Sequence, residues 1–289
     1  LKAFSVREAV RLVGCTQRCS GAFLNAIPAR APFRMHTWAL LFVVQRRLGL
    51  PLTLAVASIR RTRGETCSSH GFALDETGDV AENDGPYGHA ARHTDLNRII
   101  SSILTSVWGS STVEYEAGGD TQSYKEYSDH RPDVVLHGLG RAGAAILCDL
   151  KLFSPFTSDG SQVGLAGASV GFGNTRPAAV ERVYGLRERG SPLSGERSFN
   201  ASTGDGYVAP VEGDYARPMA SGLEVQLLLF ETLGGFGDEV HRLLTRAAAE
   251  VSNRLTSVQY DETTWSAQSW MAFAVQRISV ALHSAVAHE

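Results

Sequence analysis

Apolar and polar residues recur with two different periods through the middle of the chain, and these periods predict a helix followed by three strands. From Leu96 to Val107 the apolar residues fall three or four positions apart, which is one face of an amphipathic helix. Thr94 is a suitable N-cap for this helix, and Gly109 is expected to end it. Short apolar or alternating runs bounded by turn residues follow, at residues 112–116, 131–136 and 145–153.

The remaining pattern adds helices around these strands. The apolar positions of residues 40–48 predict a helix that ends at Gly49, with Pro51 beyond it. The further elements expected are a helix at 178–188, a strand at 223–230, and helices at 240–251 and 265–282. The order helix, strand, strand, strand, helix, strand predicts an α/β fold, in which helices flank a mixed sheet.

Composition describes an ordinary globular protein. The 289 residues are 43% hydrophobic and 20% charged, and the net charge is −3. This charge gives no global attraction to nucleic acid, so any contact depends on local basic patches. The densest patch comprises Arg46, Arg47, Arg60, Arg61 and Arg63, which a solvated face explains equally well.

The four cysteines do not form the pattern of a disulfide framework. Cys148 lies inside an apolar strand, and the others are Cys15, Cys19 and Cys67. This usage favours a reduced, intracellular compartment. The apolar run at 39–44 is too short to span a bilayer, so no membrane partner is expected.

Two carboxylates and a lysine come to one edge of the predicted sheet. Asp149 and Lys151 are two residues apart on one strand, so they share a face, and Asp133 opens the preceding strand. Two aspartates can hold a hard cation such as Mg²⁺, and a neighbouring lysine can orient or deprotonate a water. A solvent-facing strand with ordinary turn chemistry is the alternative interpretation.

A second candidate site lies in a stretch that contains one cysteine and three histidines. Cys67, His70, His89 and His93 are zinc ligands by residue type, with the spacing Cys-x₂-His and His-x₃-His. Only one thiolate is present, and residues 64–88 are acidic and typical of a loop in which histidines are exposed. Zinc binding by Cys67, His70 and His89 is therefore doubtful.

Several segments, taken in order, resemble one family. From about Ser20 onward the chain resembles the restriction-like, PD-(D/E)xK endonuclease region that follows the reverse transcriptase in certain non-LTR retrotransposons. The segments that carry the resemblance are residues 20–28, residues 47–51, Cys67, Gly78-Asp79, Arg92-His93, Pro132-Asp133, Asp149-x-Lys151, residues 230–234 and residues 276–282. Each motif is weak alone, and their common order is the specific feature.

The resemblance implies an αβββαβ restriction-endonuclease-like mixed sheet flanked by helices, with helical N- and C-terminal extensions. The regions that it implies are a helical linker at 1–66, a degenerate cysteine/histidine knuckle at 67–91, a nuclease-like core at 92–235, and C-terminal helices packed on the core at 236–289. The knuckle departs from the family, because Val80 stands where a histidine follows Gly-Asp, and Thr94 replaces the asparagine of the Arg-His-Asn signature.

The implied activity is nicking of DNA phosphodiester bonds with Mg²⁺ or Mn²⁺. Asp133, Asp149 and Glu116 would bind the metal, and Lys151 would position the attacking water. The alternatives for the third carboxylate are Glu114, on the same face as Glu116, and Asp95 on the preceding helix. A nucleic-acid-binding module without catalysis and an inactive structural remnant are the rival hypotheses.

The resemblance also implies partners. It points to DNA, to element RNA and to the reverse transcriptase domain of a parent polyprotein, and it places the protein in the nucleus. The side chains expected to contact backbone phosphates are Arg92, His93, Arg60, Arg61 and Arg63.

Overall fold

A computed structural model of the chain gives the fold, and every structural statement below concerns the residues that it describes. These are residues 5–27, 30–66, 71, 73–82, 86–115, 132–156, 216–263 and 266–288.

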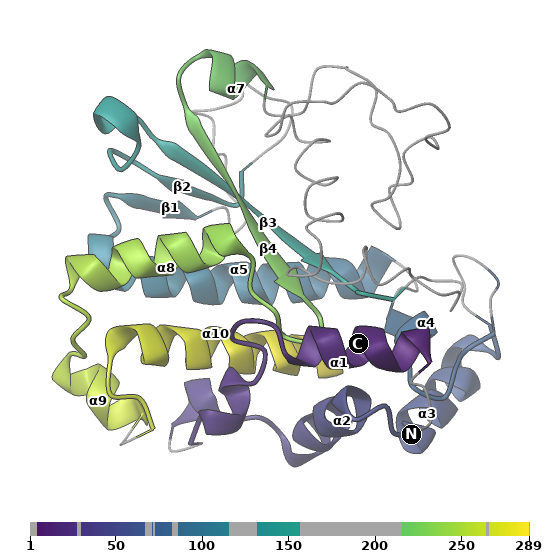
Figure 1. Cartoon of the computed structure of the whole chain (residues 1–289). Helices are drawn as coiled ribbons and strands as arrows, with labels where there is room; N and C mark the ends of the chain where they lie inside the picture. Colours follow the sequence, from purple (N-terminus) through teal and green to yellow (C-terminus); the bar gives the residue numbers. More distant parts are fainter. Residues whose placement is uncertain are drawn as a thin grey trace.

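A four-stranded mixed sheet forms the centre of the fold (Figure 1). Its strands are β1 (Val113–Tyr115), β2 (Val134–Leu136), β3 (Ile146–Phe153) and β4 (Glu224–Glu231). Spatial order follows chain order, with β1 antiparallel to β2, β2 antiparallel to β3, and β3 parallel to β4. The strands predicted at 112–116, 131–136, 145–153 and 223–230 are thereby confirmed as far as their residues are described.

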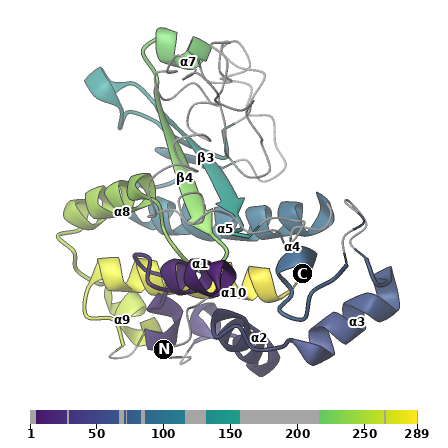
Figure 2. The same cartoon turned by 45° about the vertical axis from the view of Figure 1, so that its right-hand side comes forward.

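Helices flank the sheet on the side of its main core. In both views α5 (Pro86–Trp108) and α8 (Asp238–Glu250) lie against the sheet, and α10 (Trp270–Ala287) lies beyond them (Figures 1 and 2). Apolar residues from alternate positions of the strands, such as Val134, Ile146 and Phe230, pack with Leu96 and Trp270 in this core. The apolar face of the strands and the apolar faces of the helices, both predicted from the sequence, therefore pack together in one layer.

The helix predicted from Thr94 begins earlier than expected. Helix α5 starts at Pro86, so Thr94 lies inside it and the N-cap prediction is wrong. Proline is well suited to the first turn of a helix, because its missing N–H has no intrahelical acceptor there. The end is as predicted, since Gly109 follows Trp108 with a φ of +81°.

Short helices from the N-terminal part pack beneath the core. Helix α2 (Thr37–Arg47) and the 3-10 turn η1 (Ala22–Asn25) contact α10, while α1 (Val6–Cys15) contacts α2. Gly49 follows α2 with a φ of +67°, as predicted. The remaining helical elements are η2 (Ala31–Phe33), α3 (Thr53–Arg63), α4 (Asp79–Glu82), η4 (Arg141–Gly143), α7 (Ala216–Ala220) and α9 (Ser257–Thr263).

The helix predicted at 178–188 lies outside the described residues. The final helix begins at Trp270 rather than 265, because the hydroxyl of Ser269 caps it by accepting a hydrogen bond from the Ala272 N–H. Within the described part of the chain, no helix is both long and apolar enough to cross a membrane.

Candidate active site

The register of β2 and β3 brings Asp133 beside Asp149. Val134 lies opposite Cys148, and the Asp133 N–H donates to the Cys148 carbonyl at 2.9 Å. Side chains alternate along each strand, so Asp133 and Asp149 project to the face opposite the one that Val134 and Cys148 present to the main core. As the sequence predicts, Asp133 immediately precedes the strand beside the one that carries Asp149.

Each aspartate is tied to a neighbouring group. Oδ2 of Asp133 accepts a hydrogen bond from the Leu150 N–H at 2.6 Å and lies 3.0 Å from Nε2 of His93. Lys151 Nζ lies 3.1 Å from Oδ2 of Asp149. The site therefore contains two acidic and two basic side chains, Asp133 with His93 and Asp149 with Lys151.

The pKa values of the two aspartates are shifted in opposite directions. Asp149 is 2% exposed, and burial raises its pKa to about 7, with the charge of Asp133 acting in the same direction and Lys151 opposing both. Burial also acts to raise the pKa of Asp133, but the hydrogen bond and charge of His93, together with hydrogen bonds from Asp149 and the Leu150 N–H, bring the pKa below its ordinary value. The hydrogen bond to Asp133 raises the pKa of His93.

The donor set fits a hard cation. Oδ2 of Asp149 is buried and has no hydrogen-bond partner among the described residues, although it is paired with Lys151. Two carboxylates held together away from water repel each other, and a divalent cation between them would relieve both this repulsion and the cost of burial. Asp133 and Asp149 are therefore suitable Mg²⁺ ligands by type and proximity.

A third acidic ligand is not found beside this pair among the described residues. Glu116 lies outside them, and Glu114 is 2.8 Å from Nε2 of His137. Asp95 is 2.9 Å from Nη2 of Arg98. Across the described part of the chain, no three His, Cys, Asp or Glu side chains are grouped so that they could hold a metal ion.

The expected zinc ligands and phosphate-binding residues are only partly described. Cys67 and His70, together with the side chains of His89 and Arg63, lie outside the described residues. Arg92 is 2% exposed, so it does not present its charge to solvent. Arg60 donates to the Leu74 carbonyl at 3.0 Å and pairs with Glu65, while Arg61 is exposed.

His93 has a different environment from the one that its sequence position indicates. The sequence predicts a phosphate contact, and in the fold His93 contacts Asp133, which is 40 residues away. Asn97, one helical turn further along α5, donates to the Asp133 backbone carbonyl at 3.4 Å. His93 and Asn97, at positions i and i+4 of one helix, thus contact the same aspartate. In the sequence, the only sign of this role is that both are polar residues on a largely apolar helix.

A buried polar junction lies apart from this site. Asp79 is fully buried among three arginines. Its Oδ2 lies 2.6 Å from Nη2 of Arg11 and 3.0 Å from Nη2 of Arg7, and its Oδ1 lies 3.8 Å from Nε of Arg46. Arg46 is 3% exposed, so the expectation that it belongs to a solvated basic patch is wrong. The sequence could not show this burial, because the partners of Arg46 are far away along the chain.

Further buried contacts, next to the junction around Asp79, join the segments whose order carried the family resemblance. Arg47 donates to the carbonyls of Ser20 and Leu233, and the hydroxyl of Ser279 accepts from the Phe23 N–H at 3.1 Å. Gly234 approaches His283 and the Ser20 carbonyl so closely that a Cβ there would lie 2.6 Å from the imidazole. These motifs therefore have a shared structural role in packing the N-terminal segment against β4 and α10.

Comparisons with known proteins give no relative for this chain: no family model, no curated protein and no solved structure matches it.

Proposed function

We propose that the chain is a metal-dependent endonuclease that nicks DNA, with Asp133, Asp149 and Lys151 at its centre. The observation that carries the proposal is the convergence of these residues from adjacent antiparallel strands, with the Asp149 carboxylate buried and its pKa raised to about 7. Perturbed acidic groups beside a lysine are typical of functional sites. The mixed four-stranded sheet and its parallel β3–β4 pair support the proposal, and the helix expected at 178–188 lies outside the described residues.

The proposed roles follow from position and charge. Asp133 and Asp149 would hold Mg²⁺ or Mn²⁺, and Glu116 remains the proposed third ligand. When bound, the ion would polarise the scissile phosphate and lower the pKa of the attacking water. Lys151, which is half-buried and directed at Asp149, would donate to the phosphate oxygens or to that water as charge develops.

His93 would act on Asp133 rather than on the phosphate. Its hydrogen bond and that of the Leu150 N–H hold Oδ2 of Asp133, which fixes the carboxylate orientation and keeps it ionised. The other oxygen, Oδ1, then remains as the proposed metal ligand. His93→Gln should retain the hydrogen bond and much of the nicking, while His93→Ala should not.

Nicking of supercoiled plasmid by the purified chain tests the proposal. We expect nicking with Mg²⁺ or Mn²⁺, none with EDTA, and a loss of at least about a hundredfold in Asp149→Asn and Lys151→Ala. Asp261→Asn changes an exposed carboxylate on α9 and serves as the matched control, purified in the same way. If Asp149→Asn and Lys151→Ala nick as fast as the control, the assignment is wrong.

The second candidate is a nucleic-acid-binding module without catalysis. One observation favours it: the Asp133–His93 and Asp149–Lys151 pairs balance the charges of the site without a metal. Filter binding separates the two candidates. DNA retention that needs no divalent ion, is unchanged in Asp133→Asn and leads to no nicking would support the binding module.

A further inference from the structure

Charge is distributed very unevenly along the chain. Residues 1–64 contain eleven arginines and lysines but a single acidic residue, Glu8, whereas the whole chain has 27 basic and 30 acidic residues. The same region holds most of the large apolar side chains that are exposed among the described residues, namely Leu12, Leu24, Trp38, Leu40, Leu41, Leu48, Leu50 and Leu54. A region that is both basic and apolar at its surface needs an explanation beyond the proposed nuclease site.

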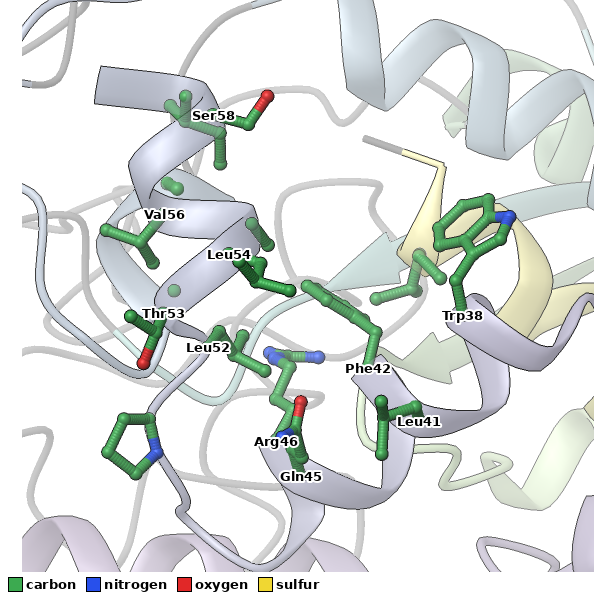
Figure 3. Close-up of a pocket in the computed structure, with 17 residues that line it drawn as sticks. Trp38, Leu41, Phe42, Gln45, Arg46, Leu52, Thr53, Leu54, Val56 and Ser58 are labelled. Atoms are coloured by element: carbon green, nitrogen blue, oxygen red, sulfur yellow. The ribbon is translucent and has the colours of Figure 1, made fainter. Parts of the chain in front are cut away.

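Three of these side chains, Trp38, Leu41 and Leu54, line a groove between α2 and α3. Its volume is about 510 Å³, and Gly78, Ala81 and the end of α10 complete its lining. Figure 3 shows Trp38, Leu41 and Phe42 on the α2 side, facing Leu54 and its neighbours across the groove. Leu54 is 88% exposed, whereas Leu52 and Val56 are buried, so the groove has a packed floor and open apolar walls.

On the α3 side of the groove Arg61 is exposed, whereas Arg60 pairs with Glu65, and exposed Glu76 lies beside Leu52 of the lining. Among the described residues that line it none is acidic, and the polar ones are few. Arg61 lies three residues beyond Ser58 and Arg60 lies four residues beyond Val56, so both extend the α3 wall by one turn. Arg46 also lines the groove, but it is buried and paired with Asp79. The exposed cation at the rim is therefore Arg61, on α3.

We propose that this groove binds an amphipathic helix of a partner protein, whose leucine-type side chains enter the groove and whose acidic residues face Arg61 on α3. Helices α2 and α3 have eleven residues each, about 16 Å, which matches roughly three turns of a bound helix. The proposal does not depend on the nuclease site.

The lining argues against two other occupants. Nucleic acid would be held by a charged groove with stacking rings, whereas these walls are mostly aliphatic and bear one paired arginine. A flat lipid surface would reach only the exposed rim and leave the concave floor formed by Leu52 and Val56 unfilled. A helix can fill both the floor and the walls.

Fluorescence anisotropy with labelled synthetic helices tests the proposal on the whole chain. The probe is a peptide of about 18 residues with leucines at i, i+3, i+4 and i+7 spacing and glutamates between them. The comparison peptides replace every glutamate with lysine, or every leucine with serine. We expect micromolar binding of the Leu/Glu peptide, at least tenfold weaker binding of both comparison peptides, and weakening between about 50 and about 300 mM NaCl.

Matched variants locate the binding. Leu41→Ser and Leu54→Ser change exposed groove residues and should each weaken binding about tenfold. Leu48 has an exposure between those of Leu41 and Leu54 but lies outside the lining, so Leu48→Ser should not weaken binding. Arg61→Glu should weaken binding, and Arg141→Glu in the β2–β3 connection should not.

Four outcomes would overturn the proposal. They are no binding of the Leu/Glu peptide at about 100 µM, equal binding of the Leu/Lys peptide, equal effects of the Leu48 and Leu54 changes, and stronger binding to anionic vesicles or single-stranded DNA than to the peptide. Nicking is measured separately, so failure here leaves the nuclease proposal as it stands.

Discussion

Replacing Asp149 with asparagine should make the folded chain more stable at alkaline pH. Between its ordinary pKa of 3.8 and its folded value of about 7, Asp149 binds a proton in the folded chain that it does not bind in the unfolded chain. Unfolding then releases a proton, so the free energy of unfolding falls as the pH rises through this window. The Asp149→Asn change would remove that dependence, because an asparagine amide does not titrate.

The magnitude follows from the size of the shift. Each pKa unit corresponds to about 1.4 kcal/mol, so the rise from 3.8 to about 7 sets an upper limit of about 4 kcal/mol. Asp149→Asn also removes the ion pair with Lys151, a loss that is moderate because the Lys151 side chain is 29% exposed. We expect a net gain of about 1–3 kcal/mol in the free energy of unfolding near pH 8, and little difference near pH 4.

Urea unfolding followed by circular dichroism, in EDTA at several pH values, measures this difference. Asp261→Asn is the control, since its carboxylate is exposed. A decrease of more than about 1 kcal/mol for Asp149→Asn near pH 8 would refute the view that this carboxylate is held ionised at a cost. Repeating the series with Mg²⁺ links stability to function, because ligand at a hundred times its Kd should stabilise the parent chain by about 2.7 kcal/mol and leave Asp149→Asn unchanged.

Three further changes address the buried junction around Asp79 and the neighbouring contacts of His283 and Gly234. His283 is fully buried, and burial lowers its pKa to about 3. The free energy of unfolding should therefore fall by up to about 5 kcal/mol as the pH falls from about 6.5 toward 3, because the unfolded chain binds the proton first. In acid unfolding curves, His283→Gln should make this pH dependence weaker. Gly234→Ala should cost about 2 kcal/mol or more in urea unfolding, because φ is +99° and the new Cβ would meet His283, while Gly138→Ala at a similar φ but in open space should cost less. Asp79→Ala leaves buried arginines without their counter-charge and should lower the midpoint of urea unfolding by the equivalent of about 3–5 kcal/mol; an effect no larger than that of the exposed Asp95→Ala would contradict the assigned role.

The elements that can be predicted from this sequence are those defined by local periodicity. The strand alternation around Asp149 and Lys151 places both on one face whatever the partner strands are, and the glycines after α2 and α5 fix the ends of those helices. The start of α5 escapes this reasoning, because the segment before Leu96 lacks the apolar period that defines the rest of the helix. Thr94 then resembles a cap only because the visible pattern begins beside it.

The interactions that could not be predicted connect residues distant along the chain. His93 and Asp133 are 40 residues apart, and Arg11 and Asp79 are 68 apart. Residue type alone does not distinguish a solvated arginine from one such as Arg46, which is buried beside a counter-charge. Burial of this kind depends on which elements pack together, and that information arises only once the sheet and helices have assembled.

The junction between the N-terminal segment and the last helix also constrains the order in which the chain can fold. The hydrogen bond from His283 to the Ser20 carbonyl spans 263 residues, and the Phe23–Ser279 bond spans 256. During synthesis η1 and α2 emerge well before their packing partner α10, which follows them in the chain. Contacts of such sequence separation form slowly, because a long loop must close before they become favourable. The apolar surface that η1 and α2 bury against α10 is therefore uncovered in the nascent chain until α10 has been synthesised.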